Sequence, residues 1–175
     1  MKRFYILLIV LLTSTMAAAQ EPITYHFSTM DGGLIWQNIY ETSQDRESII
    51  AFLETNGYIG DIIERPDGSI SCKLLPRKLN CNVSGFSNMD VSVVMAVGLI
   101  SGHAIIEFKE GRYRVTMDNM VLSGIFSTYY MLDQFALKRN GKFKNSFFNM
   151  DAIIFDHNLF QFFNVNRPAG PDPWQ

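Results

Sequence analysis

The chain has 175 residues, with 15 Lys and Arg against 17 Asp and Glu, two cysteines and a formal net charge of −2. This length favours a single domain, and no internal repeat or interdomain linker is visible. The mildly acidic balance excludes a nucleic-acid-binding role, because affinity for phosphate backbones comes mainly from clustered positive charge.

The N-terminus has the pattern of a secretory signal. Lys2 and Arg3 precede a short apolar run, and three alanines at 17–19 supply a small-residue cleavage site. The run is too short to span a bilayer comfortably, although an uncleaved anchor is the alternative, and no later segment has the length of a transmembrane helix. We predict removal of residues 1–19 and a periplasmic or extracellular mature chain. Losing the two basic residues moves its net charge from −2 to −4.

The first predicted element of the mature chain is a hairpin around Asp31-Gly32, a strong turn signal. This turn would place three pairs on shared faces: Phe27 with Trp36, Thr29 with Leu34, and Ile23 with Tyr40. A helix over 34–41 is the alternative.

A helix follows, with Ser43 as its cap, Ile49, Ile50 and Leu53 as its apolar stripe, and Gly57 as its left-handed stop. Two strands then flank a turn at 65–68.

Both cysteines lie in the next segment, 70–83. A turn centred on Pro76-Arg77 would place Leu74 opposite Leu79, Cys72 opposite Cys81 and Ile70 opposite Val83, all on one apolar face. Neighbouring thiols in an exported chain favour a disulfide, with two packed free thiols as the alternative. Two cysteines are too few for a closed zinc site, and their spacing differs from that of a redox Cys-x-x-Cys pair.

The segment 87–102 is rich in valine and reads as a strand, but Ser87 with Asp90 is also a capping-box pattern, so a short helix is the alternative. The next segment, 104–117, is the clearest hairpin. A turn at Glu110-Gly111 pairs apolar residues on one face: Phe108 with Tyr113, Ile106 with Val115, and Ala104 with Met117. The other face pairs Glu107 with Arg114 and His103 with Asp118.

The C-terminal part predicts a turn at Asn140-Gly141 and a final helix over 146–163, with Ile153, Ile154, Phe160 and Phe163 facing a sheet. We therefore predict one α+β domain over 20–165, in which helices pack on one face of a curved antiparallel meander sheet. Residues 166–175 contain three of the six prolines and are predicted to form a flexible tail.

Candidate chemistry is sparse. The three histidines (His26, His103 and His157) have no metal-ligand spacing, and no nucleophile elbow or phosphate-binding loop is present. His103 opposite Asp118 is a candidate surface pair that could begin a catalytic dyad, but the sequence places no nucleophile beside it. The cations of 138–144 read as a solvated hairpin tip. We assign no catalytic residue, cofactor or metal.

The strings "AAAQ", "GGLIWQNIYET" and "IIEFKEGRYRVTMDNM" resemble a family of exported domains of unknown function in Gram-negative bacteria. The resemblance covers about residues 22–122 and is most specific at 109–115. It implies a TATA-binding-protein-like fold, with a curved antiparallel sheet and helices on one face. The family has no catalytic residues to carry over, and the fold does not fix a function.

Three functional hypotheses follow from these observations. The leading one is a non-enzymatic exported module that binds a protein, a glycan or another envelope component with one sheet face. The second is a hydrolase of envelope or dietary polymers, which would need a nucleophile beside His103 and Asp118 or two facing carboxylates. The third is a subunit of a larger envelope assembly, which would need a large exposed apolar patch.

Overall fold

The computed structural model describes residues 25–124 and 128–167. The predicted signal peptide, the proposed partner Ile23 and most of the predicted tail lie outside the described residues. The elements are, in chain order, β1 (Phe27–Met30), β2 (Gly33–Glu41), α2 (Arg46–Thr55), β3 (Ile59–Glu64), β4 (Ile70–Lys78), the 3-10 turn η1 (Cys81–Ser84), α3 (Val93–Val97), β5 (Leu99–Lys109), β6 (Arg112–Ser123), β7 (Tyr129–Met131), α4 (Leu132–Ala136), the π-helical turn η3 (Phe147–Asp151) and α5 (Ala152–Phe163).

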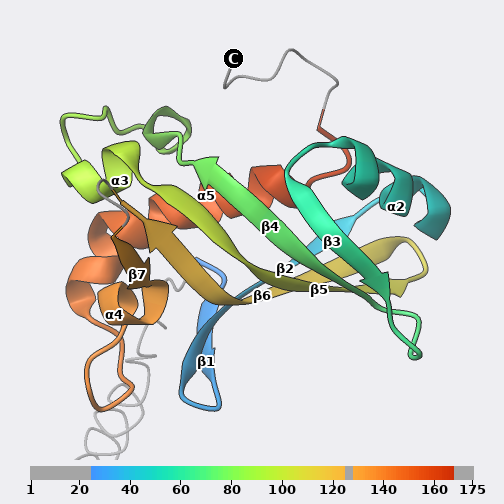
Figure 1. Cartoon of the computed structure of the whole chain (residues 1–175), viewed down its shortest axis with the longest axis horizontal. Coiled ribbons are helices and arrows are strands. Elements are labelled where there is room, and N and C mark those ends of the chain that lie inside the picture. Colours follow the sequence, from blue (N-terminus) through green and yellow to red (C-terminus); the bar gives the residue numbers. More distant parts are fainter. Residues whose placement is uncertain (1–24, 125–127, 168–175) are drawn as a thin grey trace, which may run out of the picture.

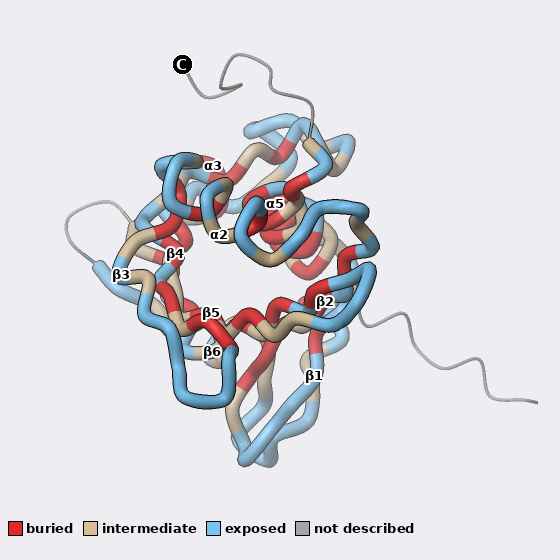
Figure 2. Tube along the Cα trace, turned by 90° about the vertical axis from the view of Figure 1, so that its right-hand side faces the viewer, coloured by how far each residue is buried: buried red, intermediate tan, exposed pale blue. Residues whose placement is uncertain are grey.

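The strands form one seven-stranded antiparallel sheet in the order β1-β2-β6-β5-β4-β3, and β7 pairs with β6. The sheet is curved, and α2, α3 and α5 lie on one side of it (Figures 1 and 2). The predicted α+β fold with helices on one face of a curved antiparallel sheet is therefore confirmed.

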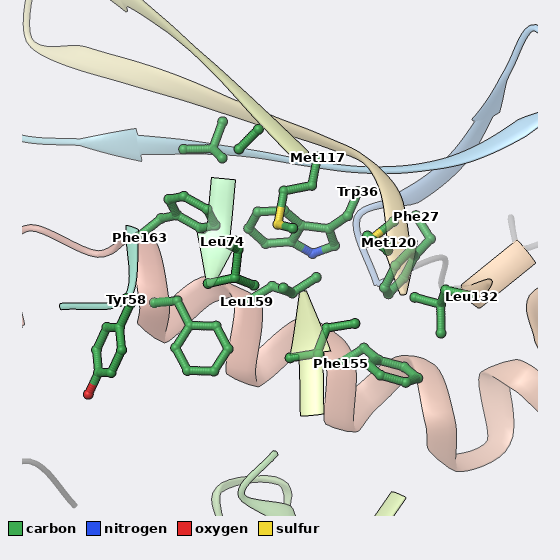
Figure 3. Packing of buried hydrophobic residues seen from close by; sticks show 14 of the residues in the cluster. Phe27, Trp36, Tyr58, Leu74, Met117, Met120, Leu132, Phe155, Leu159 and Phe163 are labelled. Atoms are coloured by element: carbon green, nitrogen blue, oxygen red, sulfur yellow. The ribbon is translucent and has the colours of Figure 1, made fainter. Parts of the chain in front are cut away.

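The core fills the space between the sheet and α5. Alternate residues of the strands point inward, as the period of two requires, and they meet an apolar face of α5 that includes Phe155, Leu159 and Phe163 (Figure 3). Trp36 and Val115 are fully buried in this layer. Each large side chain buried here stabilises the fold by about 1.5–3 kcal/mol relative to leaving it in water.

The two clearest hairpins have the predicted registers. In β5–β6, Phe108 faces Tyr113 and Ala104 faces Met117. Gly111 adopts a φ of +70° in the turn, which suits a residue without a Cβ. In β1–β2, Phe27 pairs with Trp36. The helix considered over 34–41 is wrong, because that segment is β2.

The predicted cysteine hairpin is wrong. Strand β4 does not turn at Pro76 but continues to Lys78 along β5, with a register shift between Leu74 and Arg77. This irregularity accommodates a proline, which cannot donate to a regular ladder. Cys72 therefore pairs with Ala104 of β5, whereas Cys81, its predicted partner, lies in η1.

The other predicted pairs of that hairpin separate as well. Cys81 lies in η1, where Val83 is 46% exposed, and both cysteines are buried free thiols. The chain leaves the sheet here because the buried amide of Asn158 in α5 bonds both the backbone N–H and the carbonyl of Asn80. The disulfide prediction depended on the hairpin and is corrected with it.

Three smaller predictions have mixed outcomes. The cap of α2 is Asp45, whose carboxylate accepts from Ser48 N, so the assignment of Ser43 is wrong. Gly57 does end the helix with a positive φ of 66°. Both readings of 87–102 hold in part, since a short helix, α3, precedes β5; its cap is Ser92, however, and not Ser87 as the capping-box pattern indicated.

The predicted turn at Asn140-Gly141 and the predicted final helix are confirmed. Gly141 has a φ of +74° in the predicted turn, and its N–H donates to the Lys138 carbonyl. The final helix begins with the π-helical turn η3. Of the four residues expected to face the sheet, Ile154 and Phe163 are buried, whereas Ile153 and Phe160 are half-buried.

Candidate functional site

The face of the sheet opposite α5, called the open face below, carries the outward side chains of five adjacent strands. Its members are Gln37, Ile39, Ile63, Ser71, Lys73, His103, Ile105, Glu107, Arg114, Thr116 and Asp118. They share this face because residues directly opposite on paired strands point the same way.

Ser71, His103 and Asp118 form a hydrogen-bonded chain across three strands of the open face. Ser71 Oγ lies 2.9 Å from His103 Nε2, and His103 Nδ1 lies 2.9 Å from Asp118 Oδ1. The side chains of His103 and Asp118 are 35% and 36% exposed. A hydroxyl, an imidazole and a carboxylate joined in this order can transfer a proton from the hydroxyl to the ring.

The registers of β4, β5 and β6 set this geometry. His103 is directly opposite both Lys73 and Asp118, so the imidazole lies between two neighbouring strands. Ser71 is two residues from Lys73 on the same strand and reaches the ring diagonally. The three side chains are thus positioned by hydrogen-bonded backbone rather than by loops.

A local irregularity in β6 adds a second donor to the carboxylate. The β5–β6 register shifts between Ser101 and His103, where Asn119 adopts a φ of +48°. Asn119 Nδ2 donates to Asp118 Oδ1 at 3.1 Å. The oxygen that meets His103 therefore has two hydrogen bonds, which fix its orientation.

An open depression of about 360 Å³ lies beside the imidazole. Its lining includes Lys73, Leu75, Ser101, His103 and Asn119. The Lys73 ammonium is 2.7 Å from a carboxylate oxygen of Asp61 in β3. A cation and an aliphatic wall thus adjoin the histidine at the surface.

The remainder of the open face is also cross-linked by side chains. Arg114 donates two hydrogen bonds to Glu107, at 2.8 and 2.7 Å, and these bonds lower the pKa of the Glu107 carboxyl. Gln37 Nε2 donates to Thr116 Oγ1 at 2.9 Å. Between these paired polar groups, Ile39 is 52% exposed.

The other two histidines have structural surroundings. His26 Nδ1 and Trp36 Nε1 both contact Asp156 Oδ1, at 2.8 and 2.7 Å, and so join the first hairpin to α5. His157 Nδ1 lies 3.1 Å from Ser84 Oγ at the surface.

The cysteines are poor nucleophiles in this fold. Burial raises the pKa of the Cys72 thiol to about 12, and burial also raises the pKa of Cys81. Reactive cysteines need the opposite shift, towards the thiolate.

The basic turn at 138–144 borders an open hollow of about 450 Å³, together with Gly32 and Asp133. Asp133 lines this hollow together with Lys138, Arg139 and Lys144. Its Oδ1 accepts a hydrogen bond from Leu34 N at 3.3 Å. This turn offers mixed charge rather than a purely basic surface.

Ser71 is the site residue that reasoning from the sequence missed. The sequence placed it on a supposed hairpin with 79–83, and therefore away from His103. The alternation of apolar and polar residues over 70–74 could have indicated this position, because it places Ser71 on the polar face of a strand that could pair with β5.

In the described part of the chain, no helix combines the length and apolar character needed to cross a membrane, and no cluster of three metal-ligating side chains occurs. No family model and no curated protein matches the sequence.

The chain is similar to two solved structures. One is a TBP-like protein from Parabacteroides distasonis, with 13% identity, 77% of this chain and 88% of that chain covered, and a TM-score of 0.47. The other is a DUF4468 family protein from Bacteroides ovatus, with 12% identity, 78% and 87% covered, and a TM-score of 0.46.

Proposed function

We propose that the protein is an exported module of the bacterial envelope that binds another protein through its open face. The observation that carries this proposal is the composition of that face. Ile39 and Ile63 are 52% and 62% exposed there, while the opposite face of the same sheet is occupied by the core. Ile39 lies directly opposite Arg114, and arginine is enriched at protein interfaces.

The charges of the open face support a protein as the partner. Glu107 and Arg114 form one ion pair, and Asp61 with Lys73 forms another at the edge of the face. Alternating signs complement the mixed surface of a protein, whereas a polyanion requires a patch of one sign.

Site-specific photo-crosslinking tests the binding face. A photoreactive residue replaces Ile39 in the full chain in a Gram-negative host, and Val83, 46% exposed in η1, is the matched control position. We expect a discrete protease-sensitive adduct from position 39 only, with a yield reduced several-fold by Arg114→Glu. Equal adducts at both positions, no adduct, or an adduct removed by glycosidases would contradict the proposal.

Export is tested separately by fractionation. We expect the mature chain in the periplasmic or extracellular fraction with Gln20 as its first residue, as the signal pattern predicts. A membrane-bound chain that keeps residues 1–19 would show instead that the apolar segment is an anchor.

A further inference from the structure

We propose that Ser71 is a nucleophile, with His103 as its general base, and that this site cleaves carboxylic esters with small acyl groups. This inference does not depend on the binding role proposed above. It starts from the two 2.9 Å contacts that connect Ser71, His103 and Asp118.

The partners of the imidazole assign its tautomer. An ionised carboxylate can only accept hydrogen bonds, so the proton of the neutral His103 ring lies on Nδ1, which faces Asp118. Nε2 is then the acceptor and faces the Ser71 hydroxyl. This is the arrangement in which an imidazole removes the proton of a serine during attack.

Hydrogen bonds hold Ser71, His103 and Asp118 in place, and the serine and the histidine remain accessible from solvent. Asp118 and Asn119 are positioning residues. The side-chain amide of Asn119 donates to the Asp118 oxygen that orients His103. Ser71 and His103 are half-buried on the open face, so a reagent reaches them without movement of a lid.

The surroundings suggest the kind of ester. The open depression is lined by His103, Lys73 and Leu75 but not by Ser71, so a short acyl chain of an ester held at the hydroxyl would enter it past the imidazole, towards the aliphatic side chain of Leu75. Because it is not enclosed, it accepts an ester that projects from a larger molecule. Lys73, directly opposite His103, supplies a positive charge near the developing oxyanion once it separates from Asp61.

The reaction balances without a cofactor. Ser71 Oγ forms a bond to the ester carbonyl carbon, and its proton moves to His103 Nε2. The carbon–oxygen bond to the alcohol then breaks, and the alcohol leaves with that proton. Water next attacks the acyl-serine and passes a proton to Nε2, and this proton returns to Oγ as the acid is released.

Fluorophosphonate labelling of the folded mature chain tests the assignment. Attack by Oγ forms an oxygen–phosphorus bond and expels fluoride, leaving a stable mass increment. We expect a single adduct that peptide mapping places on Ser71 in the wild-type chain, and slow hydrolysis of p-nitrophenyl acetate. Since mapping uses the wild-type protein, this result does not depend on the folding of any variant.

Variants separate nucleophilic from structural roles. Ser71→Ala removes the adduct, whereas Ser28→Ala, at an exposed serine of β1, labels at the wild-type rate. His103→Ala lowers the labelling rate by about 100-fold or more. Asp118→Asn lowers it by roughly tenfold or more, because the ring then loses the carboxylate that sets its tautomer. Thermal melting shows that each variant is folded.

Three results overturn the inference. They are the absence of an adduct, an adduct on a residue other than Ser71, and a labelling rate that is unchanged in folded His103→Ala. Any of them would identify the three side chains as a surface hydrogen-bond network only, and would leave the crosslinking test of the binding face unaffected.

Discussion

At the scale of single residues, buried polar groups of this protein occur where an element must be held in one orientation. Asp156 accepts from Trp36 and His26, and Asn158 bonds the backbone of Asn80. A buried polar group is costly unless it is paired. These contacts therefore fix the rotation of α5 against the strands, which apolar packing alone specifies less sharply.

Replacing Asp156 with Ala should lower the free energy of unfolding by about 1–3 kcal/mol, because the buried Trp36 indole N–H loses its acceptor. Asp156→Asn keeps one acceptor oxygen and should cost less. Urea denaturation measures both, with the exposed Glu54→Ala as a control that should change stability by less than about 0.5 kcal/mol. Equal losses in the two Asp156 variants would contradict this account.

The buried thiols predict a specific pH response. With the pKa of Cys72 near 12, about one folded molecule in ten thousand carries the thiolate at pH 8. We expect no reaction with a thiol reagent in the folded state and two thiols titrated after unfolding without reductant. Because the thiol ionises near pH 9 only in the unfolded chain, stability should fall as pH rises above about 9. Fewer than two titrated thiols would reinstate a disulfide.

At the scale of elements, local signals in the sequence were sufficient to pair strands that are joined by a short turn. The β5–β6 register follows from two apolar faces and a two-residue turn, and Asp31-Gly32 sets the first hairpin in the same way. The same turns, together with the alternation of apolar and polar residues along the strands, also predict the α+β class.

The errors in strand pairing occurred where a residue distant in the sequence decides the path of the chain. Pro76 with Arg77 resembles a turn, yet β5 extends β4 past this point and Asn158 directs the chain into η1. The same limit hid Ser71, because a strand gives no local indication of which other strand lies beside it. Two of the three hydrogen-bonded residues of the candidate site, His103 and Asp118, lie on one hairpin and could be predicted directly.

The cap of α2 provides an element-scale test with a matched pair. Asp45→Ala should lower the melting temperature by about 3 °C because Ser48 N loses its acceptor. Ser43→Ala, only two residues earlier, should have no measurable effect. The Ser48 hydrogen bonds lower the pKa of Asp45, so the stabilisation is present above its unfolded pKa and is lost as pH falls. A larger effect from Ser43 would restore the original assignment.

At the scale of the whole molecule, two tyrosine hydroxyls join the helical layer to the sheet. Tyr40 donates to the Phe160 carbonyl, and Tyr113 donates to the Phe163 carbonyl at 2.6 Å while accepting from Val165 N. The two rings stack at 4.8 Å. They satisfy carbonyls at the end of α5, where a helix has no bonds of its own to offer.

Tyr113→Phe should therefore destabilise the protein by about 1–3 kcal/mol, since it leaves a buried carbonyl and a buried N–H without their partner. Tyr129→Phe, at a side chain 71% exposed, is the control and should be neutral. Differential scanning calorimetry compares the two, and a neutral Tyr113→Phe would show that α5 is held by its apolar face alone.

The strand order also has a kinetic consequence. Strand β2 finds its long partner only in β6, where Trp36 meets Met117, so the first hairpin emerges during synthesis long before the strand that completes it. The β5–β6 hairpin can close locally, whereas joining it to β2 requires a large loop to close first. A ribosome-bound chain that stops before β6 should hence expose its apolar first hairpin to proteases and holding chaperones, and full protection should appear only once both β6 and α5, which covers Trp36, have been made.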